Sequence, residues 1–193
     1  MDMFFIKISE FLPFVDESSF TGNYKSKKHL IESNFGKFIT ELAAKTQYKI
    51  QDTETIIENS KPKFKNSKMC FSISHSNDIA AVIFDKHNIG LDIEFIKERD
   101  FNSISGYLNL PVKNPDKLTF YKLWTNFEAE YKSKKQKLTS FILEKDYMCS
   151  ISSFKHEKIN LYEIKSKGKH KKIDLQNINP ENFKYESIEF NEL

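Results

Sequence analysis

The chain has 193 residues, of which 39% are hydrophobic and 14% aromatic, so it can bury a core and is not a disordered polymer. Its net charge of +3, from 30 Lys and Arg against 27 Asp and Glu, is too mild to indicate a nucleic-acid-binding protein. The two cysteines lie outside any C-x-x-C or other metal-ligand spacing, so they indicate neither a disulfide framework nor a zinc site.

The N-terminal residues lack the positively charged start and long apolar run of a signal peptide. No stretch reaches the ~18 apolar residues of a membrane span. We therefore expect a cytoplasmic protein that binds neither membranes nor nucleic acid. Two lysine-rich segments, Tyr24 to His29 and Lys165 to Lys172, could hold phosphates or an acidic protein, although solvated lysines are the favoured explanation for either segment taken alone.

The N-terminal part of the chain predicts a strand and then a helix. Phe4, Ile6 and Ile8 alternate with other residues, which is typical of a strand with one buried face. Asn34 is the predicted cap of an amphipathic helix. The apolar stripe of that helix consists of Phe35, Phe38, Ile39 and Leu42.

Period-two alternation begins at Met69 and continues to Phe95. Three apolar runs separated by turn residues predict three consecutive antiparallel strands there. The segment Arg99 to Lys117 contains one glycine and two prolines and predicts a loop or a weak helix. We place the boundary between two halves at this segment, with an N-terminal half of residues 1–98 and a C-terminal half of residues 99–193.

A long helix is predicted from Asp116 to Lys137. Its apolar face consists of Phe120, Leu123, Trp124, Phe127 and Tyr131. Three further strands are predicted at Tyr147 to Phe154, Ile159 to Ile164 and Phe183 to Phe190. The order of elements predicts an α+β chain with two similar halves.

Two carboxylates share one face of a predicted strand. Side chains alternate along Ile89 to Phe95, so Asp92 and Glu94 project to the same side. Carboxylates this close repel each other unless a cation lies between them, and oxygen-rich sites suit magnesium. A strand face exposed to solvent produces the same pattern, so the spacing alone leaves both readings open.

Three more residues are candidates for the same chemistry. Glu128 and Lys132 are four residues apart on one helix face, where an ordinary ion pair is the alternative. Glu128 borders the apolar stripe and could point into a cleft beside the sheet. His75 ends a predicted strand, where histidines are commonly turn residues. Lys61, next to Pro62, is a candidate phosphate clamp with no motif of its own.

The order of these short motifs resembles the signature of the 4'-phosphopantetheinyl transferases, of the surfactin-synthetase-activating type. The motifs are K-P at 61–62, F-S-I-S-H-S at 71–76, G-L-D-I-E at 90–94 and W-T-N-F-E-A-E-Y-K at 124–132. The resemblance implies two similar α/β halves related by a pseudo-twofold axis, with coenzyme A bound between them. It implies a monomeric holo-acyl-carrier-protein synthase, which transfers the phosphopantetheine arm of coenzyme A to a serine of an apo acyl or peptidyl carrier protein.

The resemblance also implies roles for individual residues. Magnesium would be held by Asp92, Glu94 and Glu128. His75 and Lys61 would contact the phosphates of coenzyme A, and Lys132 its pyrophosphate. Negative charge accumulates on the pyrophosphate as the serine attacks, so a metal and lysines suit this reaction. Glu128 is also a candidate proton acceptor for the serine, in competition with its role as a ligand.

The chain departs from the family pattern in two places. Phe127 stands where the family carries a lysine, which removes one cation from the expected phosphate site. The segment Phe101 to Pro115 contains no carboxylate, so the glutamate that the family often places there is missing. Either Lys25 or Lys28 would correspond to the basic residues near the family's first helix, since no motif determines the register.

Two other functions remain possible. A coenzyme A or carrier-protein binding module that has lost catalysis would share the same surface, because carrier proteins are typically acidic. A magnesium nuclease would need a lysine two residues after the second carboxylate, and Ile96 occupies that position. The nuclease is therefore the weaker alternative.

Overall fold

The computed structural model describes residues 1–107, 110–134, 137–155, 158–167, 173–176 and 178–193. Its four α-helices in these ranges are α1 (Ile8–Phe11), α2 (Lys27–Gln47), α3 (Phe101–Tyr107) and α4 (Lys117–Ser133). A five-stranded sheet has the order β10-β9-β1-β5-β4 and a three-stranded sheet the order β6-β8-β7. The fold is therefore mixed α/β, which is compatible with the predicted α+β class.

The strands of the larger sheet are β1 (Asp2–Lys7), β4 (Cys70–Ser76), β5 (Ile79–Asp85), β9 (Asn160–Ser166) and β10 (Phe183–Ile188). Those of the smaller sheet are β6 (Gly90–Phe95), β7 (Lys137–Leu143) and β8 (Tyr147–Ser153). A separate hairpin consists of β2 (Thr55–Glu58) and β3 (Lys61–Phe64). All strand pairs are antiparallel except β1 with β9.

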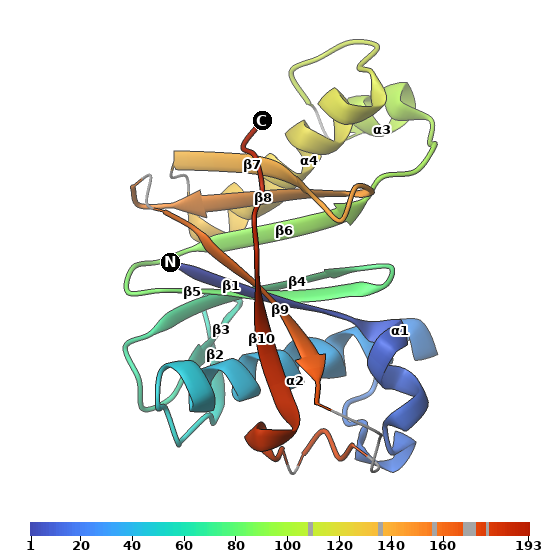
Figure 1. Cartoon of the computed structure of the whole chain (residues 1–193). Coiled ribbons are helices and arrows are strands. Elements are labelled where there is room, and N and C mark those ends of the chain that lie inside the picture. Colours follow the sequence, from blue (N-terminus) through green and yellow to red (C-terminus); the bar gives the residue numbers. More distant parts are fainter. Residues whose placement is uncertain (108–109, 135–136, 156–157, 168–172, 177) are drawn as a thin grey trace.

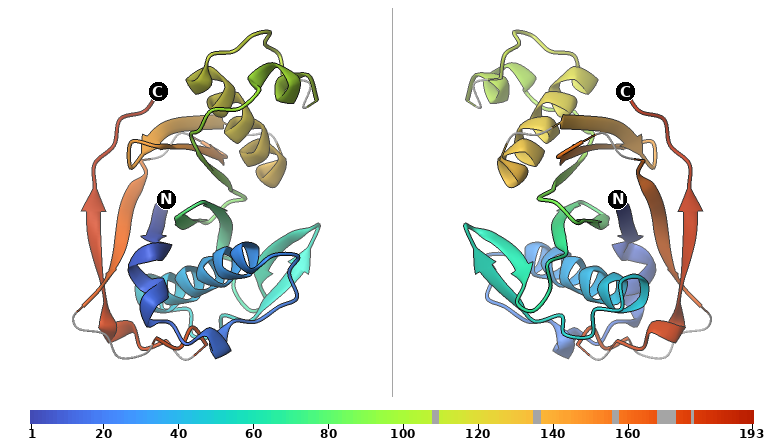
Figure 2. Two further views of the ribbon diagram at one scale, coloured as in Figure 1. Left: turned by 90° about the vertical axis from the view of Figure 1, so that its right-hand side faces the viewer. Right: turned by 90° about the vertical axis from the view of Figure 1, so that its left-hand side faces the viewer.

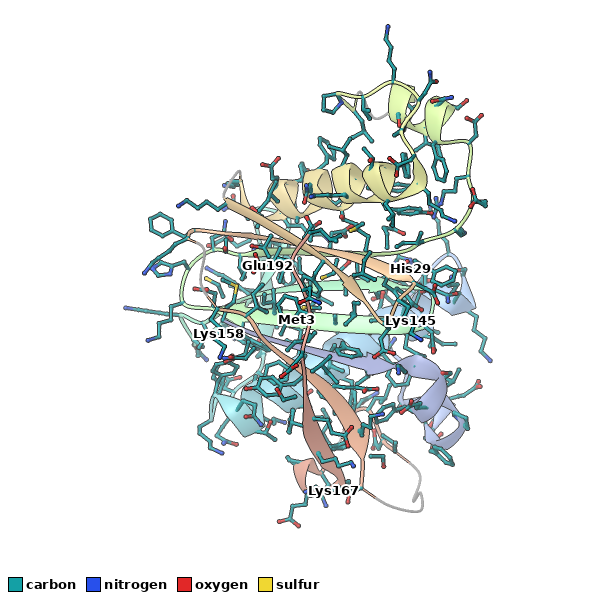
Figure 3. The ribbon with its side chains drawn as sticks, turned by 45° about the horizontal axis from the view of Figure 1, so that its top comes forward. Met3, His29, Lys145, Lys158, Lys167 and Glu192 are labelled. Atoms are coloured by element: carbon teal, nitrogen blue, oxygen red, sulfur yellow. The ribbon has the colours of Figure 1, made fainter. Side chains whose placement is uncertain are left out.

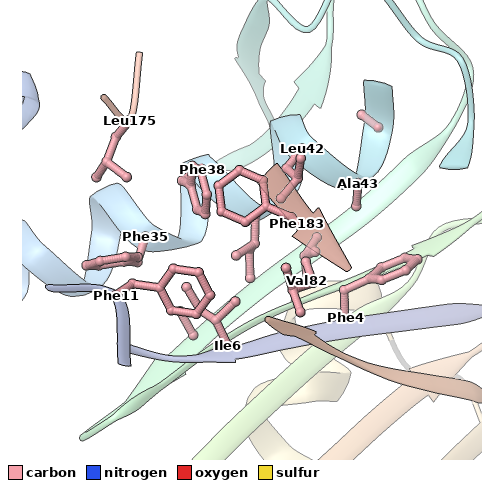
Figure 4. Close-up of a cluster of buried hydrophobic side chains, with 14 of the residues drawn as sticks. Phe4, Ile6, Phe11, Phe35, Phe38, Leu42, Ala43, Val82, Leu175 and Phe183 are labelled. Atoms are coloured by element: carbon pink, nitrogen blue, oxygen red, sulfur yellow. The ribbon is translucent and has the colours of Figure 1, made fainter. Parts of the chain in front are cut away.

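The elements stack in four layers, with α2 outside the larger sheet and α4 outside the smaller one (Figure 1). Alternation along β1 explains how one strand serves two cores. Phe4 and Ile6 pack toward α2, as Figure 4 shows, whereas Met3 and Phe5 lie between the sheets. Met3 is fully buried at the centre of the molecule (Figure 3).

β9 and β10 run along one side of the molecule, and the chain then crosses to the smaller sheet (Figure 2). There the N–H of Leu193 donates to the carbonyl of Ser140 at 2.8 Å, and Phe190 packs on Phe141 with ring centroids 4.3 Å apart. Strands from both sides of the proposed boundary thus pair with each other, β1 with β9 and β6 with β8. The division after residue 98 and the pseudo-twofold relation remain predictions.

The prediction of three consecutive antiparallel strands is correct for β4 and β5 and wrong for β6. β5 pairs with β1 on one edge and with β4 on the other, so it has no free edge for β6. β6 instead pairs with β8 in the smaller sheet. The strands β2, β3 and β7 were not predicted.

The first long helix begins earlier than predicted. Ser26 is its cap, and its hydroxyl accepts the N–H of His29 at 3.1 Å. Asn34 lies inside the helix and is buried, where its amide accepts the N–H of Thr21 and donates to the carbonyl of Leu30. The asparagine therefore ties the preceding loop to α2 rather than starting the helix.

The helix predicted from Asp116 is confirmed at its start, because the carboxylate of Asp116 accepts the N–H of Thr119 at 3.0 Å. It ends at Ser133, because Lys134 adopts a left-handed conformation with a φ of 64°. The segment Arg99 to Lys117 includes the short helix α3. Residues 168–172 of the predicted lysine-rich loop lie outside the described residues. Neither α2 nor α4, nor any shorter helix in the described ranges, has the length and apolar character needed to cross a bilayer.

Candidate active site

The free edge of β6 faces β4, and serines satisfy its N–H groups. Unpaired backbone groups of a buried edge strand need partners. Three hydroxyls that alternate along β4, here called the serine ladder, accept these N–H groups: Leu91 to Ser72 at 3.0 Å, Ile93 to Ser74 at 3.1 Å and Phe95 to Ser76 at 3.0 Å. The serine ladder holds the two sheets in register at the site.

Two lysines donate hydrogen bonds to backbone carbonyls at the same edge of β6. The ammonium of Lys132 donates to the carbonyl of Leu91 at 2.9 Å. The ammonium of Lys61 donates to the carbonyl of Ile89 and, at 2.8 Å, to the side-chain oxygen of Asn88. Both predicted phosphate-contacting lysines thus lie beside the D-x-E strand, where they are bonded to protein groups.

Asp92 is the most buried carboxylate of the predicted site, with 6% of its surface exposed. Its Oδ1 accepts hydrogen bonds from the hydroxyl of Ser74 at 3.0 Å and from Lys132 at 2.8 Å. Its Oδ2 is buried and has no hydrogen-bond partner among the described residues. Burial raises the pKa of Asp92, and the charge of Lys132 opposes that rise.

Glu94 projects to the same face as Asp92, as predicted from the alternation, while Leu91 and Ile93 point into the core between the sheets. Its Oε2 accepts a hydrogen bond from Ser76 at 3.2 Å. A guanidinium nitrogen of Arg99 lies 3.9 Å from the same oxygen. Burial, and then the charge of Asp92, raise the pKa of Glu94.

Gly90 allows α4 to pack directly on β6. A Cβ atom at this position would lie 1.9 Å from the carbonyl oxygen of Ala129, so any side chain would force the helix away. The close approach is what brings Lys132 within reach of β6. The glycine that opens the G-L-D-I-E motif therefore serves packing.

The helix and the strand run in opposite directions. Tyr121, early in α4, bonds the backbone of Lys97 just after β6, whereas Lys132 bonds Asp92. One helical turn advances about 5.4 Å and two strand residues about 6.8 Å. Glu128, one turn before Lys132 on the same helix face, is therefore displaced toward the Glu94 end of the strand.

The described residues contain no cluster of three His, Cys, Asp or Glu side chains that could hold a metal ion. The three-carboxylate set of Asp92, Glu94 and Glu128 remains a prediction. The donor chemistry nevertheless suits a hard cation, because Asp92 and Glu94 offer oxygens on one face and no described residue bonds the Oδ2 of Asp92. A buried carboxylate oxygen without a partner is costly, and a cation would compensate for it.

His75 points to the opposite face of β4 from the serine ladder. Its Nδ1 lies 3.6 Å from a carboxylate oxygen of Glu32. Its ring meets that of His29 (labelled in Figure 3) edge-on, with ring centroids 5.4 Å apart. Burial, with smaller contributions from His29 and Lys132, lowers the pKa of His75 to about 4. The histidine is therefore neutral at pH 7.

Sequence reasoning missed Glu32, which is only 7% exposed and lies 3.6 Å from the ammonium of Lys28. It also missed the serines and Arg99. A signal for the serines was present, because serine recurs at every second position of F-S-I-S-H-S. Nothing in the sequence around Glu32 or Arg99 distinguishes them from surface charges.

A cleft of about 890 Å³ opens between the β2–β3 hairpin, β4 and the C-terminal end of α4. Four lysines line it, at positions 61, 63, 132 and 134. Phe127 and Tyr131 form an aromatic wall, with 46% and 76% of their surfaces exposed. Glu58 and Glu130 also line the cleft, and Asp92, Glu94 and Glu128 are not among its described lining residues. The four lysines, together with the apolar surface, suit a ligand that carries both phosphates and an uncharged ring or chain.

Comparison with known proteins points in the same direction as this geometry. The chain is 35% identical over 89 residues to the Haemophilus influenzae protein named "Putative 4'-phosphopantetheinyl transferase", and the match covers 39% of this chain. The match supports a transferase of the 4'-phosphopantetheinyl transferase superfamily. It does not distinguish the types within it. This chain spans 37% of the length of that relative. No protein-family model matches this chain.

Proposed function

We propose that this protein is a 4'-phosphopantetheinyl transferase of the surfactin-synthetase-activating type. It moves the phosphopantetheine arm of coenzyme A to a serine of an apo acyl or peptidyl carrier protein and depends on Mg²⁺. The observation that carries the proposal is the buried Asp92, which binds the ammonium of Lys132 through Oδ1 and whose Oδ2 has no hydrogen-bond partner in the part of the chain that the structure describes. A monomer in the cytoplasm belongs to the same proposal.

In this reaction the serine oxygen forms a bond to the β-phosphorus of coenzyme A, and the bond from that phosphorus to adenosine 3',5'-bisphosphate breaks. Negative charge grows on the pyrophosphate oxygens. A magnesium ion held by Asp92, Glu94 and Glu128 would supply the charge that stabilises them. Glu128 is the candidate that takes the serine proton.

The lysines of the cleft would meet the remaining negative charge. Lys132 is held between Asp92 and the carbonyl of Leu91, so its ammonium is placed before any ligand binds. Burial lowers the pKa of Lys61 to about 8, and its ammonium would have to exchange Asn88 for a phosphate. An anion nearby would raise the pKa again and keep Lys61 charged.

The test is mass spectrometry of apo acyl carrier protein incubated with this protein, coenzyme A and Mg²⁺. We expect the carrier to gain the mass of one phosphopantetheine arm, and we expect a chelator to prevent this. The substitution Asp92→Asn keeps the shape of the side chain and should abolish transfer. Transfer that persists unchanged in Asp92→Asn would show that the metal assignment is wrong.

A catalytically inactive binding module is the second candidate. The observation that favours it is Phe127, which places an apolar ring on the cleft wall where the family carries a lysine. Binding of coenzyme A without transfer to any of several apo carriers would support this candidate over the enzyme.

A further inference from the structure

The three members of the serine ladder have the same backbone contact but different partners for the hydroxyl proton. Each accepts one N–H of β6. Ser74 in addition donates to Oδ1 of Asp92 at 3.0 Å, and Ser76 to Oε2 of Glu94 at 3.2 Å. At the corresponding place opposite Ser72, the residue of β6 is Gly90, which offers no side chain.

A hydroxyl has one proton and two acceptor sites. Because a backbone N–H occupies an acceptor site of Ser74, the direction of its proton is restricted, and Oδ1 of Asp92 lies within reach. The hydroxyl and the ammonium of Lys132 both donate to Oδ1, at 3.0 Å and 2.8 Å, and leave Oδ2 without a partner among the described residues. The hydroxyl of Ser76 donates to Oε2 of Glu94 in the same way.

We propose that Ser74 and Ser76 are positioning residues, each of which orients one carboxylate by binding one of its oxygens and directs the other oxygen toward a shared divalent cation. The orientation of the carboxylates stands on the contacts of the serine ladder. The cation itself rests on the proposed function. Outer partners of this kind commonly change metal affinity by about 10- to 100-fold.

The alternative is that the serines only satisfy the free edge of β6. Ser72 is a matched control, because it makes the same backbone contact at 3.0 Å, against 3.1 Å for Ser74 and 3.0 Å for Ser76, and has no carboxylate partner among the described residues. Replacing any of the three serines by alanine removes an N–H acceptor. Only the replacement of Ser74 or Ser76 also removes a bond to a carboxylate.

The first experiment measures Mn²⁺ binding to the full chain by electron paramagnetic resonance, for the wild type and for Ser72→Ala, Ser74→Ala, Ser76→Ala and Ser74→Thr. We expect the dissociation constant to rise about tenfold or more in Ser74→Ala and Ser76→Ala. It should stay close to that of the wild type in Ser72→Ala and in Ser74→Thr, which keeps the hydroxyl. Equal weakening in Ser72→Ala and Ser74→Ala would overturn the inference.

The second experiment separates this inference from the metal assignment. Melting temperatures are measured in chelator for Ser74→Ala, Asp92→Ala and their combination, and for the matching set with Ser72→Ala, because alanine at position 92 leaves no side-chain acceptor for the Ser74 hydroxyl. We expect the shifts to be non-additive for Ser74 with Asp92 and additive for Ser72 with Asp92. Additive shifts for Ser74 would overturn the inference. Non-additive shifts in a protein that binds no Mn²⁺ would retain the positioning role and contradict the metal site.

Discussion

Phe127 is the residue of the cleft at which this chain departs from the 4'-phosphopantetheinyl transferase pattern that it resembles. Restoring the lysine with Phe127→Lys adds a cation beside the proposed phosphate site, where hydrogen bonds to charged groups contribute about 1.5–3 kcal/mol. We expect coenzyme A to bind about tenfold more tightly by isothermal titration calorimetry. Tyr131→Lys adds the same charge one turn away, and an equal gain there would show that only net charge matters.

His75 gives stability a pH dependence of predictable sign. Burial lowers its pKa from 6.5 to about 4, so the unfolded chain binds this proton more readily than the folded chain. The part of the free energy of unfolding that depends on a neutral His75 is fully present above pH 6.5 and is lost as the pH falls toward 4. Glu32, beside the ring, opposes this loss of stability, because burial raises its pKa and the folded chain takes up that proton more readily. Lys28 and His29 add positive charge, which favours the neutral form of His75.

The measurement is urea unfolding at pH 7 and pH 5. Between these values the wild type should lose about 2 kcal/mol more than His75→Gln, which cannot take up a proton. An identical loss in both proteins would show that His75 is not desolvated in the folded state.

At the scale of elements, the contact between α4 and β6 depends on Gly90. Gly90→Ala would place a methyl group against a backbone carbonyl that cannot move independently, and we expect a loss of about 3 kcal/mol. Gly106→Ala in α3 is the control, because its Cβ would meet nothing within 4 Å and alanine favours helices by about 0.5–1 kcal/mol. The midpoints of urea unfolding measure the change in stability of both variants. A Gly90→Ala protein as stable as the wild type would contradict the direct packing of α4 on β6.

The helices and strands were predictable where apolar residues recur along the sequence with the period of a strand or a helix. Alternation placed Asp92 and Glu94 on one face, and the apolar stripe of the second long helix placed its start at Asp116. The partner of β6 was not predictable, because strand pairing depends on which edges distant strands leave free. The contacts of Ser74 and Ser76 follow from that pairing and were therefore missed as well. The resemblance identified the candidate residues, but their hydrogen-bond partners required the fold.

At the scale of the whole molecule, the larger sheet combines strands from both predicted halves. We expect residues 1–98, expressed alone, to lack a stable fold, because β1 would leave the edge that pairs with β9 unpaired. The measurement is the chemical-shift dispersion of amide protons by nuclear magnetic resonance. A well-dispersed, cooperative spectrum of this fragment would instead support two independent domains.

The pairing of β1 with β9 also has a consequence during synthesis. Asp2 and Asn160, which are hydrogen-bonded through their side chains at 2.7 Å, lie 158 positions apart. During synthesis β1 must therefore wait for the 158 positions that separate Asp2 from Asn160 before its second neighbour arrives. Such a high contact order slows folding and exposes an apolar strand edge to aggregation. We expect newly made chains to depend on chaperones that shield β1 until β9 has emerged.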